Sequence, residues 1–87
     1  MLVNYHSNQV DVMSEVVGGR TFCYHSCRIS RTAVIFAVGS VGPRMCFSAS
    51  MSSTGVIKPE SIGNWKFTLE QYEFVQSKTI ELLGEFL

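Results

Sequence analysis

A pair of glycines interrupts a stretch of hydrophobic, β-favouring residues near the start of the chain. Gly18 and Gly19 lie between β-favouring residues, and glycine readily adopts the positive φ angles that a two-residue hairpin turn requires. The pattern predicts a strand over residues 9–17 that pairs with a second strand over residues 20–29.

The segment over residues 9–17 has an alternative interpretation as a short helix. Val10, Met13 and Val17 recur at helical spacing, and Gly18 would then cap the helix at its C-terminal end. Four of the nine residues are valines, which lose side-chain freedom in a helix. We therefore favour the strand.

Two further strands are predicted in the middle of the chain. A continuous apolar run over residues 32–38 suits a central strand that is covered on both faces. Residues 39–43 have the composition of a turn. Residues 44–50 alternate between apolar and small polar side chains, as a half-buried strand does. Residues 56–57 indicate a short edge strand.

The C-terminal segment has the periodicity of an amphipathic helix of about five turns. Thr68 and Gln71 have the spacing of a capping box, and Phe67 precedes them as a hydrophobic staple. The apolar side of the helical wheel, which we expect to meet the core, carries Leu69, Tyr72, Val75, Ile80, Leu82, Leu83, Phe86 and Leu87. The opposite side carries Glu70, Glu73, Ser77, Lys78, Glu81 and Glu85.

These elements predict one small α+β domain over residues 1–87, an antiparallel meander of four or five strands packed against one long C-terminal helix. The chain is 46% hydrophobic and 16% charged, which excludes intrinsic disorder. Its longest apolar run, over residues 33–38, is far shorter than the ~20 residues that span a bilayer. We expect no membrane association.

Three cysteines cannot all pair within one chain, and the opening residues 1–6 lack the basic and apolar regions of a signal peptide. The expected environment is the reducing cytoplasm, with free thiols. A domain of this size has a thin margin of stability. We therefore expect self-association, as a homodimer, to supplement it.

Cys23, His25 and Cys27 would point to the same face of a strand, and Cys46 would come from a neighbouring strand. Thiolates with an imidazole are ligands that zinc prefers. Ligands two residues apart on a strand converge poorly on one ion, however, because their backbones are about 6.6 Å apart. A zinc or thiol site is therefore the third hypothesis, behind the interpretation of the cysteines as small core residues.

The sequence shows no catalytic constellation. The only imidazoles are His6 and His25, and no nucleophile elbow or phosphate-binding glycine motif is present. We therefore expect a non-enzymatic protein without a cofactor.

The charges are distributed unevenly although they sum to zero. No acidic residue occurs between Glu15 and Glu60, whereas arginines are frequent there. Basic strands with an aromatic side chain are typical of single-stranded nucleic-acid binding. This second hypothesis rests on Arg20, Tyr24, Arg28, Arg31 and Arg44.

The preferred hypothesis is protein–protein contact through the outer face of the C-terminal helix. Phe74 falls among charged residues on the wheel, opposite the apolar stripe, and a large ring on a charged face often marks a binding hot spot. The predicted binding residues are Phe74, Glu70, Lys78, Glu81 and Trp65. The predicted function is that of an accessory protein, regulator or inhibitor that binds another protein. Short chains of this kind are frequent in phages and mobile elements, so a viral accessory protein is one hypothesis for its origin.

Overall fold

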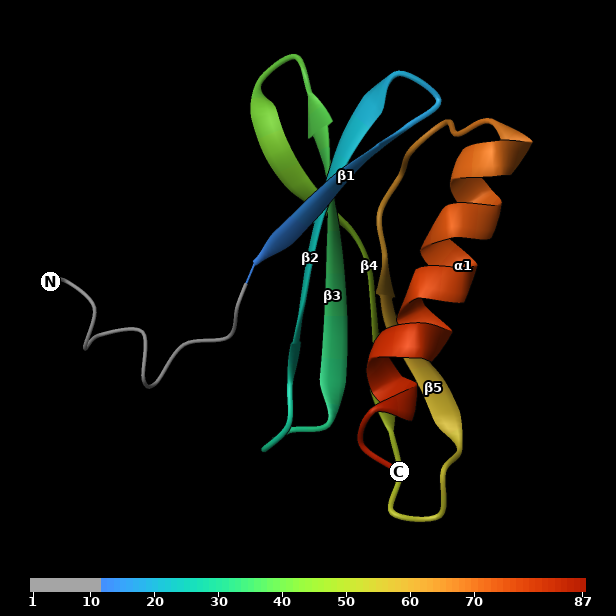
Figure 1. The fold of residues 1–87 in the computed structure, drawn as a ribbon. Coiled ribbons are helices and arrows are strands. Elements are labelled where there is room, and N and C mark those ends of the chain that lie inside the picture. The colour runs from blue at the N-terminus through green and yellow to red at the C-terminus, as the bar shows by residue number, and fades with distance from the viewer. Residues whose placement is uncertain (1–11) are drawn as a thin grey trace, which may run out of the picture.

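The computed structural model describes residues 12–87, which form a five-stranded antiparallel sheet with one helix packed on it (Figure 1). The strands lie side by side in the order of the chain. The elements are β1 (Met13–Val17), β2 (Arg20–Cys27), β3 (Thr32–Gly39), β4 (Gly42–Met51), β5 (Ile57–Ile62) and α1 (Leu69–Gly84). The predicted α+β meander with a C-terminal helix is confirmed, with five strands.

The first hairpin forms at the glycine pair. Val17 pairs with Arg20 in an antiparallel register, and Gly18 and Gly19 have φ angles of 59° and 79°, as a two-residue type I′ turn requires. The predicted strand is confirmed over Met13–Val17, where the helical alternative is wrong. Residues 9–11 of that prediction lie outside the described residues.

The two faces of the sheet are covered differently. Phe22 and Ile35 point toward α1 and are fully buried, whereas Val34 and Phe36 point to the other face and are half-buried. The expectation that residues 32–38 are covered on both faces is therefore wrong. A single helix covers one face of a sheet, and the described part of the chain has no further element for the other face (Figure 1).

The start of α1 agrees with the sequence prediction. Thr68 Oγ1 accepts a hydrogen bond from the backbone N–H of Gln71, and Gln71 Oε1 accepts one from the backbone N–H of Thr68. This reciprocal pair is the predicted capping box. It satisfies two of the backbone donors that a helix leaves unpaired at its N-terminus.

The side of α1 that meets the sheet differs from the predicted apolar stripe. The buried helix residues are Gln71, Val75, Thr79, Leu82 and Leu83. Four residues that were predicted to face the core are instead exposed, with exposed fractions of 74%, 53%, 54% and 84%: Leu69, Tyr72, Ile80 and Leu87. At 100° per residue, α1 is turned about its axis by roughly 50° from the predicted orientation.

No helix in residues 12–87 combines the length and the hydropathy that crossing a membrane requires.

Candidate functional site

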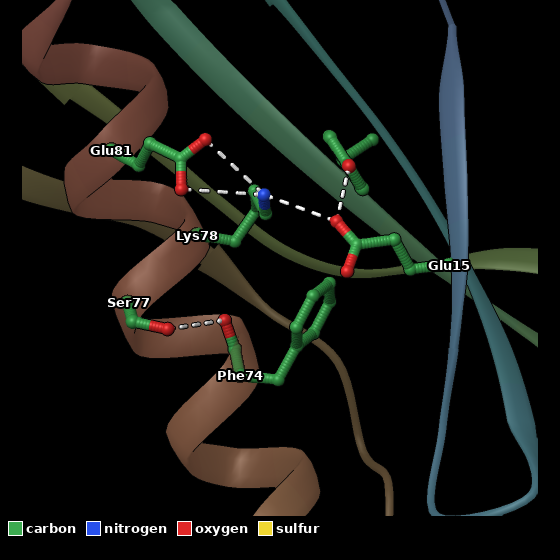
Figure 2. Close-up of polar contacts among 6 residues, drawn as sticks. Glu15, Phe74, Ser77, Lys78 and Glu81 are labelled. Carbon is green, nitrogen blue, oxygen red and sulfur yellow. Dashed lines mark hydrogen bonds and ion pairs between the residues drawn. The ribbon is translucent and has the colours of Figure 1, made fainter.

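A network of polar and aromatic side chains joins α1 to the edge strand β1 (Figure 2). Lys78 Nζ lies 3.1 Å from Glu15 Oε2 and 3.3 Å from Glu81 Oε2. The Tyr24 hydroxyl donates a hydrogen bond of 2.5 Å to Glu15 Oε2, and Lys78 Nζ is 4.7 Å from the centre of the Tyr24 ring. We call these four residues the Lys78 clamp, because they fasten the helix to β1 and β2.

The contacts of the clamp shift the pKa values of Glu15, Tyr24 and Lys78. The hydrogen bond from Tyr24, and then that from Lys78, hold the pKa of Glu15 below its usual range. The hydrogen bond to Glu15 raises the pKa of Tyr24, and burial raises it further. Burial lowers the pKa of Lys78, but hydrogen bonds to Glu15 and Glu81 outweigh this effect and raise it to about 12. At neutral pH the clamp thus joins an ionised Glu15 to a protonated Lys78 and a neutral Tyr24, the states in which its ion pair and hydrogen bond form.

Phe74 is half-buried and packs against the core rather than standing on the outer face of α1. Its ring centroid is 5.2 Å from that of Phe22 and 6.1 Å from that of Tyr24. Figure 2 shows the ring extending from α1 on the side of the clamp. The expectation of an exposed Phe74 anchor is therefore wrong, because the turn of α1 about its axis brings Phe74 and Lys78 toward the sheet.

The other predicted protein-binding residues do not gather on one surface. Lys78 has only 12% of its side chain exposed and is held in the clamp with Glu81. Glu70 is exposed in the first turn of α1. Trp65 is half-buried in the segment that leads into α1.

A buried amide fixes the position of the N-terminal end of α1. Gln71 is only 4% exposed, and its Nε2 donates hydrogen bonds to the backbone carbonyls of Val17 and Gly18 at 3.1 and 3.3 Å. A buried amide without partners is costly, so these bonds hold the helix beside the β1–β2 hairpin. The Lys78 clamp acts on the same side, and α1 packs mainly on β3 and β4.

An apolar groove remains between α1 and the strands β4 and β5. Its volume is about 500 Å³. Two of its lining residues, Ile62 and Ile80, are 75% and 54% exposed, so the groove is open to solvent at these residues. We call it the α1–β5 groove, and its walls include Phe47, Ile57, Ile62, Tyr72, Gln76 and Ile80.

Trp65 lines the groove at the end where α1 begins. Its ring stacks on that of Phe67 with centroids 5.6 Å apart. It also lies against Gly39, where a Cβ atom would come within 3.3 Å of the indole. Trp65 is thus both packed on the sheet and accessible from the groove.

The cysteines and His25 do not form the proposed zinc site. Cys23 and His25 pair with Phe36 and Val34 on the uncovered face of the sheet, whereas Cys46 is buried with the core on the α1 side. Among residues 12–87, no three potential ligands are close enough to hold a metal ion. The opposite orientation of Cys46 arises at a β-bulge, where the register between β3 and β4 shifts beside Phe36.

The five residues of the nucleic-acid hypothesis also do not share one face. Arg20 begins β2, whereas Arg28 and Arg31 follow its other end. Arg28 lies over the Phe86 ring at 5.4 Å, and Arg31 donates to the backbone carbonyls of residues 51 and 52. Tyr24 is buried in the clamp and offers no ring for stacking. Only Arg20 and Arg44 come together, beside Trp65.

The sequence analysis did not predict that the groove residues form an exposed apolar surface. It assigned Tyr72 and Ile80 to the core and did not consider Ile62. One signal for this surface was present in the sequence. The apolar stripe on the helical wheel is wider than the strip of a helix that packing on a sheet buries. The apolar residues of the edge strand were a second signal.

Comparison of the chain with protein-family models, with curated proteins and with solved structures finds no match.

Proposed function

We propose that this protein is a non-catalytic binding domain that holds an amphipathic α-helix of another protein in the α1–β5 groove. The observation that carries the proposal is the exposure of Ile62 on β5 and of Tyr72 and Ile80 on α1, which line the two sides of one groove. Contiguous exposed apolar surface on a small protein often marks an interaction site. As a regulator or inhibitor, the protein would act by sequestering the bound helix.

α1 does not cover the whole of this face of the sheet. Five strands spaced about 4.8 Å apart measure roughly 19 Å from β1 to β5, and a helix with its side chains is about 10 Å wide. α1 packs mainly on β3 and β4, and the bound helix would lie beside it along β5, in the α1–β5 groove. Addition of a strand at β5 is disfavoured because Pro59 lacks a backbone N–H.

The charges of α1 indicate which helix fits. Lys78 is its only basic residue and is already paired with Glu15 and Glu81. Glu70 and Glu73 are exposed and form no ion pair with any of residues 12–87, and Glu73 precedes Ile80 by seven residues, on nearly the same side of the helix. The bound helix should therefore carry Lys or Arg beside its apolar stripe.

A second copy of this chain suits the groove less well. Its own α1 would bring acidic residues against Glu70 and Glu73, and like charges at an interface are unfavourable. The homodimer expected from the sequence stays a prediction, and its presence at the groove is one outcome of the experiment below.

The test uses two synthetic amphipathic peptides of 18 residues with the same pattern, one of leucine and lysine and one of leucine and glutamate. Fluorescence anisotropy of the labelled peptides measures binding to the wild type and to two variants. Ile80→Ser removes an apolar wall of the groove, and Ile29→Ser is the matched control because Ile29 is 96% exposed in the β2–β3 turn. The leucine–lysine peptide should bind, and Ile80→Ser should weaken it about tenfold.

Equal binding of both peptides, or equal losses in Ile80→Ser and Ile29→Ser, would contradict the proposal. Sedimentation equilibrium of the unliganded protein provides a second readout. A stable dimer that dissociates in Ile80→Ser would show that a second copy occupies the groove, and the partner-helix proposal would then be wrong.

A further inference from the structure

We propose that Arg20 and Arg44 form a binding site for an oxyanion of the phosphate class beside Trp65. The guanidinium carbons of Arg20 and Arg44 lie 5.1 and 5.8 Å from the centre of the Trp65 ring. The two carbons are thus at most about 11 Å apart, which is the sum of these distances. They come from different strands, so only the fold brings them together.

The register of the sheet explains this convergence. Arg44 pairs with Ala37, and Ala37 also pairs with Phe22, so the three residues form one row across β4, β3 and β2 on the α1 side. Arg20 is the next position of β2 on that side, two residues before Phe22. Gly39 has no side chain, so the indole of Trp65 lies directly on the sheet, within reach of both arginines.

Neither arginine has a counter-charge in the described part of the chain. Both ion pairs found among residues 12–87 use Lys78. Arg20 Nη1 is buried and finds no hydrogen-bond acceptor among the same residues. A cation–π contact accounts for the position of each guanidinium. It provides no hydrogen-bond acceptor for the N–H donors and no negative charge to balance the two positive ones.

The arrangement suits a tetrahedral oxyanion. A carboxylate is planar and fits the fork of one guanidinium, whereas a phosphate presents oxygens in several directions and accepts from two guanidinium groups at once. Arg44 is exposed, so its side chain is free to turn toward an anion held by Arg20. The shared chemistry is that of a phosphate group, free or within a nucleic-acid backbone.

Trp65 is the only tryptophan of the chain, so its fluorescence reports on this site. The full chain is titrated with inorganic phosphate, and with sodium chloride at matched ionic strength. We expect a saturable change with phosphate alone. Arg44→Gln should weaken phosphate binding at least tenfold, whereas Arg28→Gln should leave it unchanged, because Arg28 also lies over an aromatic ring but at the opposite end of β2.

A second titration with a single-stranded ten-residue thymidine oligonucleotide distinguishes the two sources of phosphate. Tighter binding of the oligonucleotide that is lost in Arg44→Gln assigns the site to a nucleic-acid backbone. Binding of inorganic phosphate alone assigns it to a small anion. Both results support the oxyanion site.

Three results would overturn the oxyanion site: no saturable change, the same change with chloride, or equal weakening in Arg28→Gln. Ile80→Ser, which alters the groove, should leave phosphate binding intact, so this inference and the proposed helix binding fail independently. Far-UV circular dichroism and urea unfolding confirm that each variant is folded.

Discussion

Lys78 Nζ on α1 lies 3.1 Å from Glu15 Oε2 on β1, and this ion pair connects the first described strand to the last element of the fold. The hydrogen bonds from Gln71 to the β1–β2 hairpin act on the same side of the helix. Together they orient α1 so that Phe74 packs against the core and Ile80 faces the groove. The polar contacts of α1 thus decide which of its apolar residues are available to a partner.

The Lys78 clamp predicts a stability plateau from about pH 5 to pH 10. The pKa of Lys78 is raised from an ordinary 10.5 to about 12, so its contribution is complete below pH 10.5 and is lost as the pH rises toward 12. The pKa of Glu15 is lowered from an ordinary 4.5, so its contribution is present above that pH and is lost as the pH falls. Urea unfolding at pH 3.5, 7 and 11.5 measures both losses.

The variant Lys78→Met should show a flatter decline in the free energy of unfolding above pH 10. Lys66→Met removes an exposed lysine outside the clamp and should keep the wild-type profile. An unchanged alkaline decline in Lys78→Met would show that Lys78 does not produce it.

Phe74→Ala should destabilise the protein by about 2–3 kcal/mol, since it removes a ring that packs on Phe22 and Tyr24. Glu73→Ala changes an exposed neighbour on the same helix and should stay within about 0.5 kcal/mol of the wild type. Chemical denaturation measures both values. A loss below about 0.5 kcal/mol in Phe74→Ala would instead support the exposed position that the helical wheel suggests.

Gly63→Ala should cost about 1–3 kcal/mol. A Cβ atom at this position would lie 2.7 Å from the backbone oxygen of Met45 and 3.1 Å from the Cα of Cys46, and neither backbone atom moves easily. Gly84→Ala is the control, because a Cβ there meets nothing within 4 Å and alanine favours the helix. Thermal unfolding should give a lower Tm for Gly63→Ala and an equal or higher Tm for Gly84→Ala, each compared with the wild type. Equal Tm values for the two variants, at or above that of the wild type, would contradict the close approach at Gly63.

The cysteines should differ in reactivity toward iodoacetamide at neutral pH. A hydrogen bond from the Ser30 side chain lowers the pKa of Cys27, whereas burial raises that of Cys46 to about 11. Because the thiolate is the reactive form, Cys27 should be alkylated well before Cys46. Peptide mass spectrometry over a time course measures the order, and Cys27→Ser should remove the fastest phase. Alkylation of Cys46 first would contradict its burial.

The features that could be predicted from the sequence depend on neighbouring residues. The hairpin at Gly18 and Gly19 follows from backbone preference, and the capping box of Thr68 and Gln71 from two side chains within one helical turn. The strand over residues 44–50 follows from alternation with a period of two, and the strand over residues 32–38 from a continuous apolar run. Each of these signals lies within a few residues, so it acts before any tertiary contact forms.

The candidate site could not be predicted in the same way. The helical wheel placed Ile80 in the core and Phe74 in solvent, because it weighs apolar side chains alone. Burying one more isoleucine contributes about 1.5–3 kcal/mol, and an unpaired buried amide such as Gln71 costs a comparable 1–3 kcal/mol. The partners of Gln71 are backbone carbonyls more than fifty residues away, which no local pattern reveals.

The sequence by itself determined the α+β class, the first four strands, the first turn and the start of the helix, since local backbone preferences and periodicity are sufficient for each. The tertiary structure alone decided how α1 is turned, where the α1–β5 groove opens, and that Arg20 and Arg44 meet at Trp65 while Cys46 is separated from Cys23. These outcomes depend on pairs of residues from different strands and on a bulge that changes the register. The interactions that decide them contribute to the free energy of folding only when the sheet and the helix have come together.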